Sequence, residues 1–152
     1  MKKIFLTTSV CLLLLLVAQG QTMHKKDAQQ ILEHALRYLK TSDTASFINL
    51  WLLDDSPYPF HQHPFTVEDV KNDFAHLKVF LDTALAQNYK IDHIEIEKEE
   101  SKNKNERLGE YLVKAWFKYN EHYYKGFGFY VEYKNERWVV RFSPDTSSMT
   151  KD

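Results

Sequence analysis

The fold is decided by residues 111–142, YLVKAWFKYNEHYYKGFGFYVEYKNERWVVRF. Along this stretch apolar side chains recur at every second position, which is the period of a β-strand with one buried face. The positions predicted to point inward are Val113, Ala115, Phe117, Tyr119, Phe127, Phe129, Val131 and Tyr133. Polar pairs at Asn120-Glu121 and Asn135-Glu136 predict tight turns, and the second turn leads into a last strand from Trp138 to Phe142. The stretch therefore predicts three antiparallel strands joined by hairpins.

A fourth strand is predicted upstream, over residues 90–97, where isoleucines alternate with charged side chains. The intervening KEESKNKNE segment, residues 98–106, has the composition of a solvated loop. Gly126 and Gly128 fall inside a predicted strand, where glycine commonly marks a bend or a bulge. We therefore expect a curved, four-stranded antiparallel meander.

The segments before the meander have the 3.6-residue period of amphipathic helices. One helix is predicted over residues 27–40 and a short second one after Asp43 or Thr44. A long third helix is predicted from Thr66, with a partial capping box, to about Asn88. Two or three helices followed by strands predict an α+β domain rather than an alternating α/β one.

Residues 1–20 have the features of a cleaved secretory signal peptide. A basic start precedes an uncharged run from Ile4 to Ala18, and small residues stand where a signal peptidase would cut before Gln21. The run is 15 residues long, whereas a membrane-spanning helix needs roughly 20 apolar residues. Cys11 lies inside this run, whereas a lipoprotein cysteine follows it. We expect export to the periplasm or out of the cell.

Removal of residues 1–20 leaves a weakly acidic chain without cysteine. Lys plus Arg falls from 20 to 18 while Asp plus Glu stays at 21, which gives a formal charge of −3. No disulfide can then form, and neither nucleic acid nor an anionic membrane would be attracted electrostatically. A hydrophobic content of 43% suits one packed domain. We place it at residues 27–143, between a flexible stretch over 21–26 and a disordered tail over 144–152.

Helices followed by a bent meander resemble the NTF2-like superfamily of cone-shaped α+β proteins over residues 27–143. The resemblance rests on element order, the long third helix and the aromatic closing strands. A cystatin-like arrangement, one helix wrapped by a sheet, is the nearest alternative. The resemblance implies an exported bacterial protein whose interior holds a small ligand, carries an isomerase or dehydratase site, or is filled by side chains. It also implies a homodimer formed through the sheet.

The candidate ligand-binding residues are the inward aromatics, which would stack on a flat apolar molecule or simply form core. They are Phe117, Tyr119, Phe127, Phe129 and Trp138. Enzymes that resemble ketosteroid isomerase pair a carboxylate with a tyrosine in the cone. Tyr119 and Tyr133 are predicted to point inward, but no Asp or Glu in the predicted strands does. We therefore favour a non-catalytic binding domain over a small isomerase, dehydratase or hydrolase, and we predict no cofactor.

The candidate partner-binding residues are large aromatics predicted on the outward face, where solvent favours polar side chains. They are Trp116, Tyr124 and Tyr130. They suit a second class of function, an exported immunity or inhibitor protein that binds a toxin or an enzyme.

A weak metal site is suggested by His61 and His63 in the proline-rich segment 54–65, with Asp54 or Asp55 as a third ligand. A loop that packs over the cavity mouth is the favoured interpretation, because metal sites usually need more ligands at defined spacings. The sequence contains no nucleophile elbow, phosphate-binding loop, dinucleotide fingerprint or zincin motif.

Overall fold

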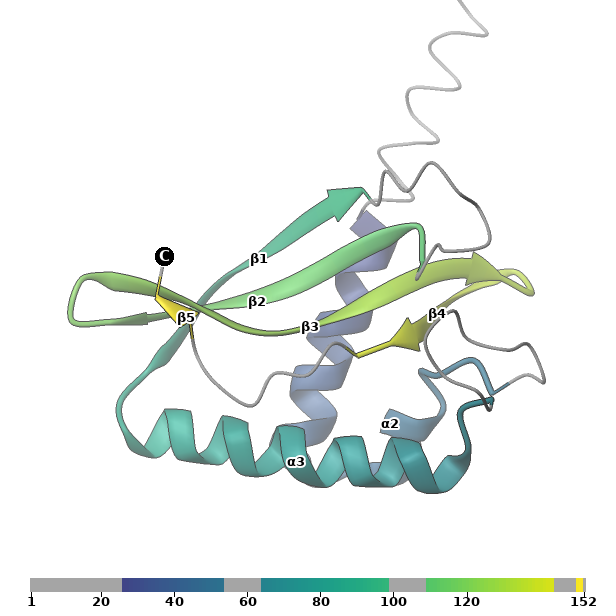
Figure 1. Cartoon of the computed structure of the whole chain (residues 1–152), viewed down its shortest axis with the longest axis horizontal. Coiled ribbons are helices and arrows are strands. Elements are labelled where there is room, and N and C mark those ends of the chain that lie inside the picture. Colours follow the sequence, from purple (N-terminus) through teal and green to yellow (C-terminus); the bar gives the residue numbers. More distant parts are fainter. Residues whose placement is uncertain (1–25, 54–63, 99–108, 144–149, 152) are drawn as a thin grey trace, which may run out of the picture.

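Figure 1 shows the computed structural model of the chain, which describes residues 26–53, 64–98, 109–143 and 150–151. Residues 26–41 form a helix, here called the N-terminal helix. The other elements are α2 (Thr44–Ile48), α3 (Val67–Ala86), β1 (Lys90–Lys98), β2 (Tyr111–Tyr119), β3 (His122–Lys134), β4 (Arg137–Phe142) and β5 (Thr150–Lys151). Strands β1 to β4 form an open antiparallel sheet in chain order, and β5 adds to β3. The predicted α+β class is confirmed.

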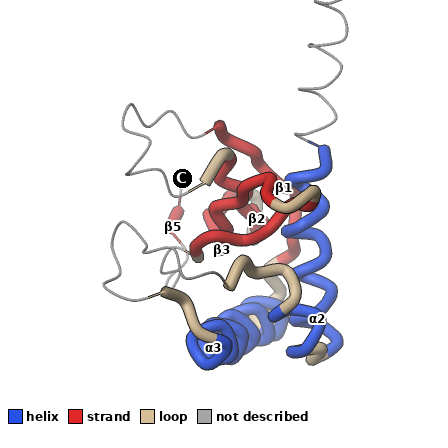
Figure 2. The backbone as a smooth tube through the Cα atoms, turned by 90° about the vertical axis from the view of Figure 1, so that its right-hand side faces the viewer, coloured by secondary structure: helices blue, strands red, loops and turns tan. Residues whose placement is uncertain are grey.

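The helices lie on one side of the sheet. In Figures 1 and 2 the N-terminal helix crosses one face of the strands, and α3 runs below them, crosswise to that helix. We call the face of the sheet toward the helices the inner face and the opposite one the outer face. The described residues place no helix over the outer face.

Helices α2 and α3 each begin where a side chain accepts hydrogen bonds from the first backbone amides. Thr66 and Asp69 form a reciprocal capping box at the start of α3, with Asp69 Oδ2 accepting from Thr66 N at 2.8 Å. Asp43 Oδ1 accepts from Ser46 N at 3.0 Å at the start of α2. Hydrogen bonds with the side chain of Ser46 and with its backbone amide hold the pKa of Asp43 below its usual value. Both caps were predicted from sequence. They fix the points at which the chain enters its helices.

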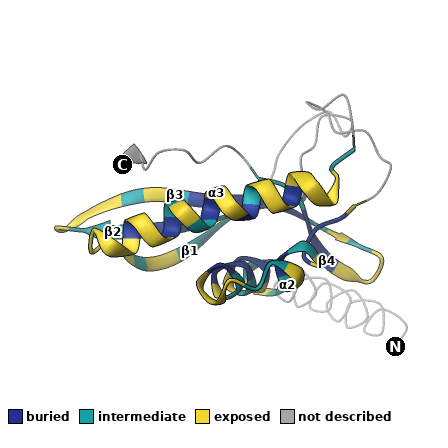
Figure 3. Cartoon of the chain, turned by 90° about the horizontal axis from the view of Figure 1, so that it is seen from below, coloured by how far each residue is buried: buried dark blue, intermediate teal, exposed yellow. Residues whose placement is uncertain are grey.

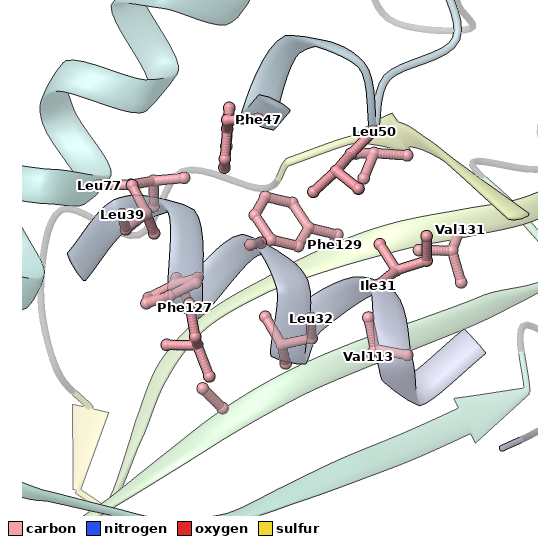
Figure 4. Packing of buried hydrophobic residues seen from close by; sticks show 14 of the residues in the cluster. Ile31, Leu32, Leu39, Phe47, Leu50, Leu77, Val113, Phe127, Phe129 and Val131 are labelled. Atoms are coloured by element: carbon pink, nitrogen blue, oxygen red, sulfur yellow. The ribbon is translucent and has the colours of Figure 1, made fainter. Parts of the chain in front are cut away.

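The core is built where the helices meet the inner face. Figure 4 shows Phe129 of β3 between Phe47 of α2, Leu50 and the N-terminal helix. The ring centroids of Phe47 and Phe129 are 6.1 Å apart in an edge-to-face contact. Figure 3 shows α3 with buried residues on one side and exposed residues on the other. Its buried residues are Val70, Phe74, Leu77, Leu81 and Ala84, while Leu85 near its end is exposed.

The hairpins turn through residues with positive φ. Asn120 and Glu121 have φ of 47° and 62°, and Asn135 and Glu136 have φ of 52° and 61°. Two consecutive residues in this region form the tight turn whose twist matches that of the strands. The turns set the register: Tyr119 is opposite His122, and the next pair inward along the hairpin is Lys118 and Tyr123.

A bulge in β3 separates two halves of the sheet. Lys114 pairs with Gly128 and Trp116 pairs with Lys125, so Gly126 and Phe127 together face Ala115. Because of the extra residue, odd-numbered positions of β3 point inward after the bulge, whereas even-numbered positions point inward before it. A Cβ on Gly126 would overlap the ring of Phe117 and lie 3.0 Å from the carbonyl oxygen of Ala115. Glycine is therefore required at the bulge, as its place in the sequence suggested.

A second bulge lies in β1, where Ile91 pairs with Phe117 and His93 pairs with Trp116, which leaves Asp92 unpaired in the ladder to β2. At the other end of the sheet, the chain after α2 closes the edge of β4. Leu52 N donates to Val140 O at 2.9 Å, and Val140 N donates to Leu50 O at 2.7 Å. No described residue pairs with the outer edge of β1.

Three expectations need correction. Tyr124 was predicted on the outer face, but the β3 bulge turns it inward, opposite Phe117 and against Tyr89 with ring centroids 5.3 Å apart. Tyr133 was predicted inside, but it lies at the end of the sheet and stays 43% exposed. The segment after Pro144 was expected to contain no element, whereas Thr150–Lys151 pairs with β3.

We expect Gly126→Ala to destabilise the fold, because the new methyl group must displace the Phe117 ring. Overpacking of this kind costs about 1–3 kcal/mol, which urea denaturation would measure. The cost should fall in a Phe117→Leu background, where the side chain is smaller. Val79→Ala, at an exposed position of α3, is the control and should change stability little. Equal costs of Gly126→Ala in both backgrounds would contradict this account of the bulge.

Candidate interaction surface

The inward aromatics predicted to bind a ligand are mostly used to build the core. Phe117, Phe127 and Phe129 are fully buried. The ring of Phe80 in α3 contacts Phe117 and Phe127 edge-on, at centroid distances of 6.1 and 6.2 Å. Their surfaces are therefore covered by other side chains of the protein. The described core contains no buried polar or charged residue, so this part of the chain offers no buried acid–base pair.

The two other candidate ligand residues lie at opposite ends of the inner face. Tyr119 stacks on Tyr89 with ring centroids 4.6 Å apart. Trp138 is buried and contacts the rings of Tyr111 and Tyr133, at 5.7 and 5.6 Å. The structure therefore separates the five predicted residues into a central core and two end clusters, and it does not bring them together around one cavity.

The outer face carries an aromatic cluster centred on Trp116. The imidazole of His93 lies parallel to the indole, with ring centroids 5.7 Å apart and an interplanar angle of 11°. Lys125 Nζ lies 5.5 Å from the indole centroid, in cation–π geometry. Tyr123 contacts the His93 ring edge-on at 6.2 Å, and Lys118 Nζ lies 5.7 Å from the Tyr123 centroid. We call these residues, His93, Trp116, Lys118, Tyr123 and Lys125, the Trp116 cluster.

Hydrogen bonds hold the Trp116 cluster in place. Trp116 Nε1 donates to Glu95 Oε2 at 2.8 Å. Lys114 Nζ bridges two carboxylates, at 3.1 Å from Glu95 and 2.7 Å from Glu97. His93 Nδ1 lies 2.7 Å from Asp92 Oδ2. These bonds hold the indole, the imidazole and the acidic side chains of β1 in one arrangement.

These contacts shift the titration of two groups. The Trp116 indole N–H holds the pKa of Glu95 below its usual value; partial burial opposes this, and Lys114 reinforces it. Partial burial lowers the pKa of Lys114, but its bonds to Glu97 and Glu95 outweigh burial and raise that pKa above its usual value. Both side chains therefore stay charged over the whole neutral range.

A shallow groove of about 630 Å³ lies beside the Trp116 cluster, between the N-terminal helix and β1. The helix contributes Leu36, Arg37 and Lys40 to its lining, and β1 contributes Ile91 and His93. The groove therefore adjoins the Trp116 cluster at His93 and follows the open edge of the sheet.

The three partner-binding candidates lie in three different environments. Trp116 points outward as predicted but is only 7% exposed, because His93 and Lys125 cover it. Tyr124 lies on the inner face. Tyr130 is half-buried beside Phe142, with ring centroids 6.1 Å apart. Tyr123, which the sequence analysis missed, is the exposed aromatic of the cluster at 42%. Counting pairs back from the Asn120-Glu121 turn would have placed it beside Lys118.

The weak metal candidates His61 and His63 lie outside the described residues. Within the ranges that are described, no group of three His, Cys, Asp or Glu side chains could hold a metal ion. No helix in those ranges is long and apolar enough to cross a membrane.

We expect Trp116→Phe to raise the pKa of Glu95 toward its usual value, because the ring is kept and the N–H is lost. NMR titration of the Glu95 side-chain carboxyl carbon would measure this. A depressed pKa adds stability above the unfolded-state value, and this stability disappears as pH falls through the folded-state value. The destabilisation by Trp116→Phe should therefore shrink on acidification. Tyr123→Phe is the control, because it leaves the hydrogen bond between Trp116 and Glu95 in place. An unchanged Glu95 titration in Trp116→Phe would contradict the assignment.

No family model matches this chain, and no curated protein or solved structure matches it either. The case for its function therefore rests on its own residues.

Proposed function

We propose that this protein is an exported, non-catalytic interaction module that binds a protein partner through the outer face of its sheet. One observation carries the proposal: its aromatic side chains are divided between two faces. Phe117, Phe127 and Phe129 are fully buried in the core, whereas on the outer face His93 stacks on Trp116 and the exposed Tyr123 contacts His93. A small apolar ligand in the interior has less support, because the rings that would hold it already contact other side chains.

The chemistry of the Trp116 cluster suits protein recognition. Trp and Tyr are enriched among the residues that dominate binding energy at protein interfaces. Here the indole, the imidazole and Lys125 are already held by one another and by Glu95. Little side-chain freedom remains to be lost on binding, which lowers the entropic cost of association.

The charges around the cluster are close to balanced. Lys114 is bonded to Glu95 and Glu97, and Lys118 lies 3.1 Å from Glu121. A partner would therefore be recognised through shape and aromatic contact rather than through a large opposite charge. We expect its affinity to depend only weakly on salt, because exposed net charge is what salt screens. An immunity or inhibitor protein that binds a toxin or an enzyme fits this description.

Two further parts of the proposal rest on the order of elements and on the N-terminus. The NTF2-like fold is supported by the three helices that precede a meander bent by bulges in β1 and β3. Export is supported by the basic start, the apolar run and the small residues before Gln21.

A photo-crosslinking amino acid at Tyr123 should capture a partner in cells of the native host. The same amino acid at Val79, on the exposed side of α3, is the matched control and should not capture it. With the partner identified, Tyr123→Ala should weaken binding about 10-fold or more, the effect of losing one dominant interface residue. Equal capture at both positions, or an affinity unchanged by Tyr123→Ala, would refute the outer-face assignment.

Export predicts a mature chain that begins at Gln21. Intact mass spectrometry of the protein recovered from the host envelope would identify the N-terminus, and a species that retains Met1 would refute cleavage. Replacement of Ala18 and Gly20 by bulky residues should block processing, because a signal peptidase requires small side chains at these positions.

A further inference from the structure

We propose that β5 occupies a strand-addition site on β3, and that an extended strand of the protein partner replaces β5 when the partner binds. This inference rests on the proposed function and names the form of the partner. Two strands share one edge of β3: β4 pairs with residues 130–134, and β5 pairs with Tyr124 and Lys125. In Figure 1, β5 lies beside the part of β3 that is nearest its hairpin to β2. The structure itself therefore shows that this edge accepts an antiparallel strand.

β5 is a short strand at the periphery of the sheet. It consists of Thr150–Lys151, and in the described part of the chain it pairs with β3 alone. β3 has 13 residues, so a longer strand at the same edge would make more main-chain hydrogen bonds. Short peripheral segments open at a small cost in free energy. Exchange of β5 for a longer partner strand is therefore favourable, because main-chain hydrogen bonds supply the affinity in strand addition.

The strand-addition site adjoins the Trp116 cluster. β3 is regular on the hairpin side of its bulge, where Tyr123, Tyr124 and Lys125 pair in order with residues 118, 117 and 116 of β2. Tyr123 and Lys125 lie on the outer face, and Tyr124 lies on the inner face. A strand in the place of β5 would present alternate side chains to these two faces. One segment of a partner would thus contact both the edge of β3 and the Trp116 cluster.

The side chains of β3 predict the composition of the partner strand. The ion pairs of the outer face use Lys114 and Lys118, whereas Lys125 contacts the Trp116 ring. Opposite charges and apolar pairs stabilise directly opposed positions on neighbouring strands. The strand that fits best therefore has an acidic residue opposite Lys125 and a β-branched or aromatic residue opposite Tyr124. β5 has threonine and lysine at these positions, so its sequence is the weaker match.

Short synthetic peptides test this inference without the natural partner. The probe is acetyl-Thr-Val-Glu-Val-Thr-amide, which in a strand has glutamate on one face and valine on the other. The control peptide has lysine in place of glutamate. In an NMR titration of the whole chain, the amide signals of Tyr123, Tyr124 and Lys125 should shift, and the glutamate peptide should bind more tightly. Lys125→Glu should reverse this preference, a result that loss of folding cannot produce.

Removal of β5 should raise the affinity for the glutamate peptide. If β5 is docked in about nine-tenths of the molecules, its removal raises the apparent affinity about 10-fold. The test variant ends at Met149, and the matched control ends at Lys151 and keeps β5. Replacing both Thr150 and Lys151 by proline is a second way to abolish the pairing. Successive amides of a strand point to opposite edges, so one of the two faces β3, and proline cannot donate a hydrogen bond.

Three results would overturn the inference: equal affinity with and without β5, the same peptide preference in Lys125→Glu as in the unmodified chain, or no binding of either peptide. Each of them would leave the outer-face assignment standing, because crosslinking at Tyr123 tests that assignment with the natural partner. Peptide binding at this edge together with failed crosslinking would instead refute the outer-face assignment, while the exchange of β5 would stand.

Discussion

The packing of the Phe117 ring over Gly126 is the contact on which the rest of the structure depends. It requires a residue without a side chain opposite Ala115, and the chain supplies one by placing Gly126 and Phe127 together at a bulge. On one side of the bulge, Phe127 and Phe129 point into the core. On the other side, the reversal turns Tyr124 inward, and Tyr123 and Lys125 outward. A regular strand would have exposed Tyr124 and buried Tyr123.

The same bulge creates the outer surface. It brings Lys125 over Trp116, while the bulge at Asp92 in β1 sets His93 against the other side of the indole. Two irregularities in neighbouring ladders thus converge on one tryptophan, whose N–H is held by Glu95. Most of the aromatic side chains pack in the core, and their burial stabilises the fold. The Trp116 cluster on the outer face is small, ordered and close to neutral in charge.

The helices and strands could be predicted from the sequence because their periodicity, caps and turns are encoded by residues close together in the chain. Thr66 and Asp69 mark the start of α3, and the two Asn-Glu pairs mark the hairpin turns. The site was harder to predict, because a side chain's face depends on register, and one extra residue reverses it. Ile91 broke the alternation of β1 and was the available sign of the bulge at Asp92. Nothing local distinguishes Phe129 in a filled core from Phe129 lining a cavity, since that depends on α2 and the N-terminal helix.

The central claim is that the interior is filled and that recognition belongs to the outer face. Xenon binding followed by methyl NMR tests it most directly, because xenon enters empty apolar cavities. The methyl groups of Leu32, Val113 and Val131, which lie around the buried rings, are the reporters. A filled core predicts only small shifts, linear in xenon pressure. Saturable shifts at these methyl groups would reveal a cavity open to small apolar molecules and would contradict the account.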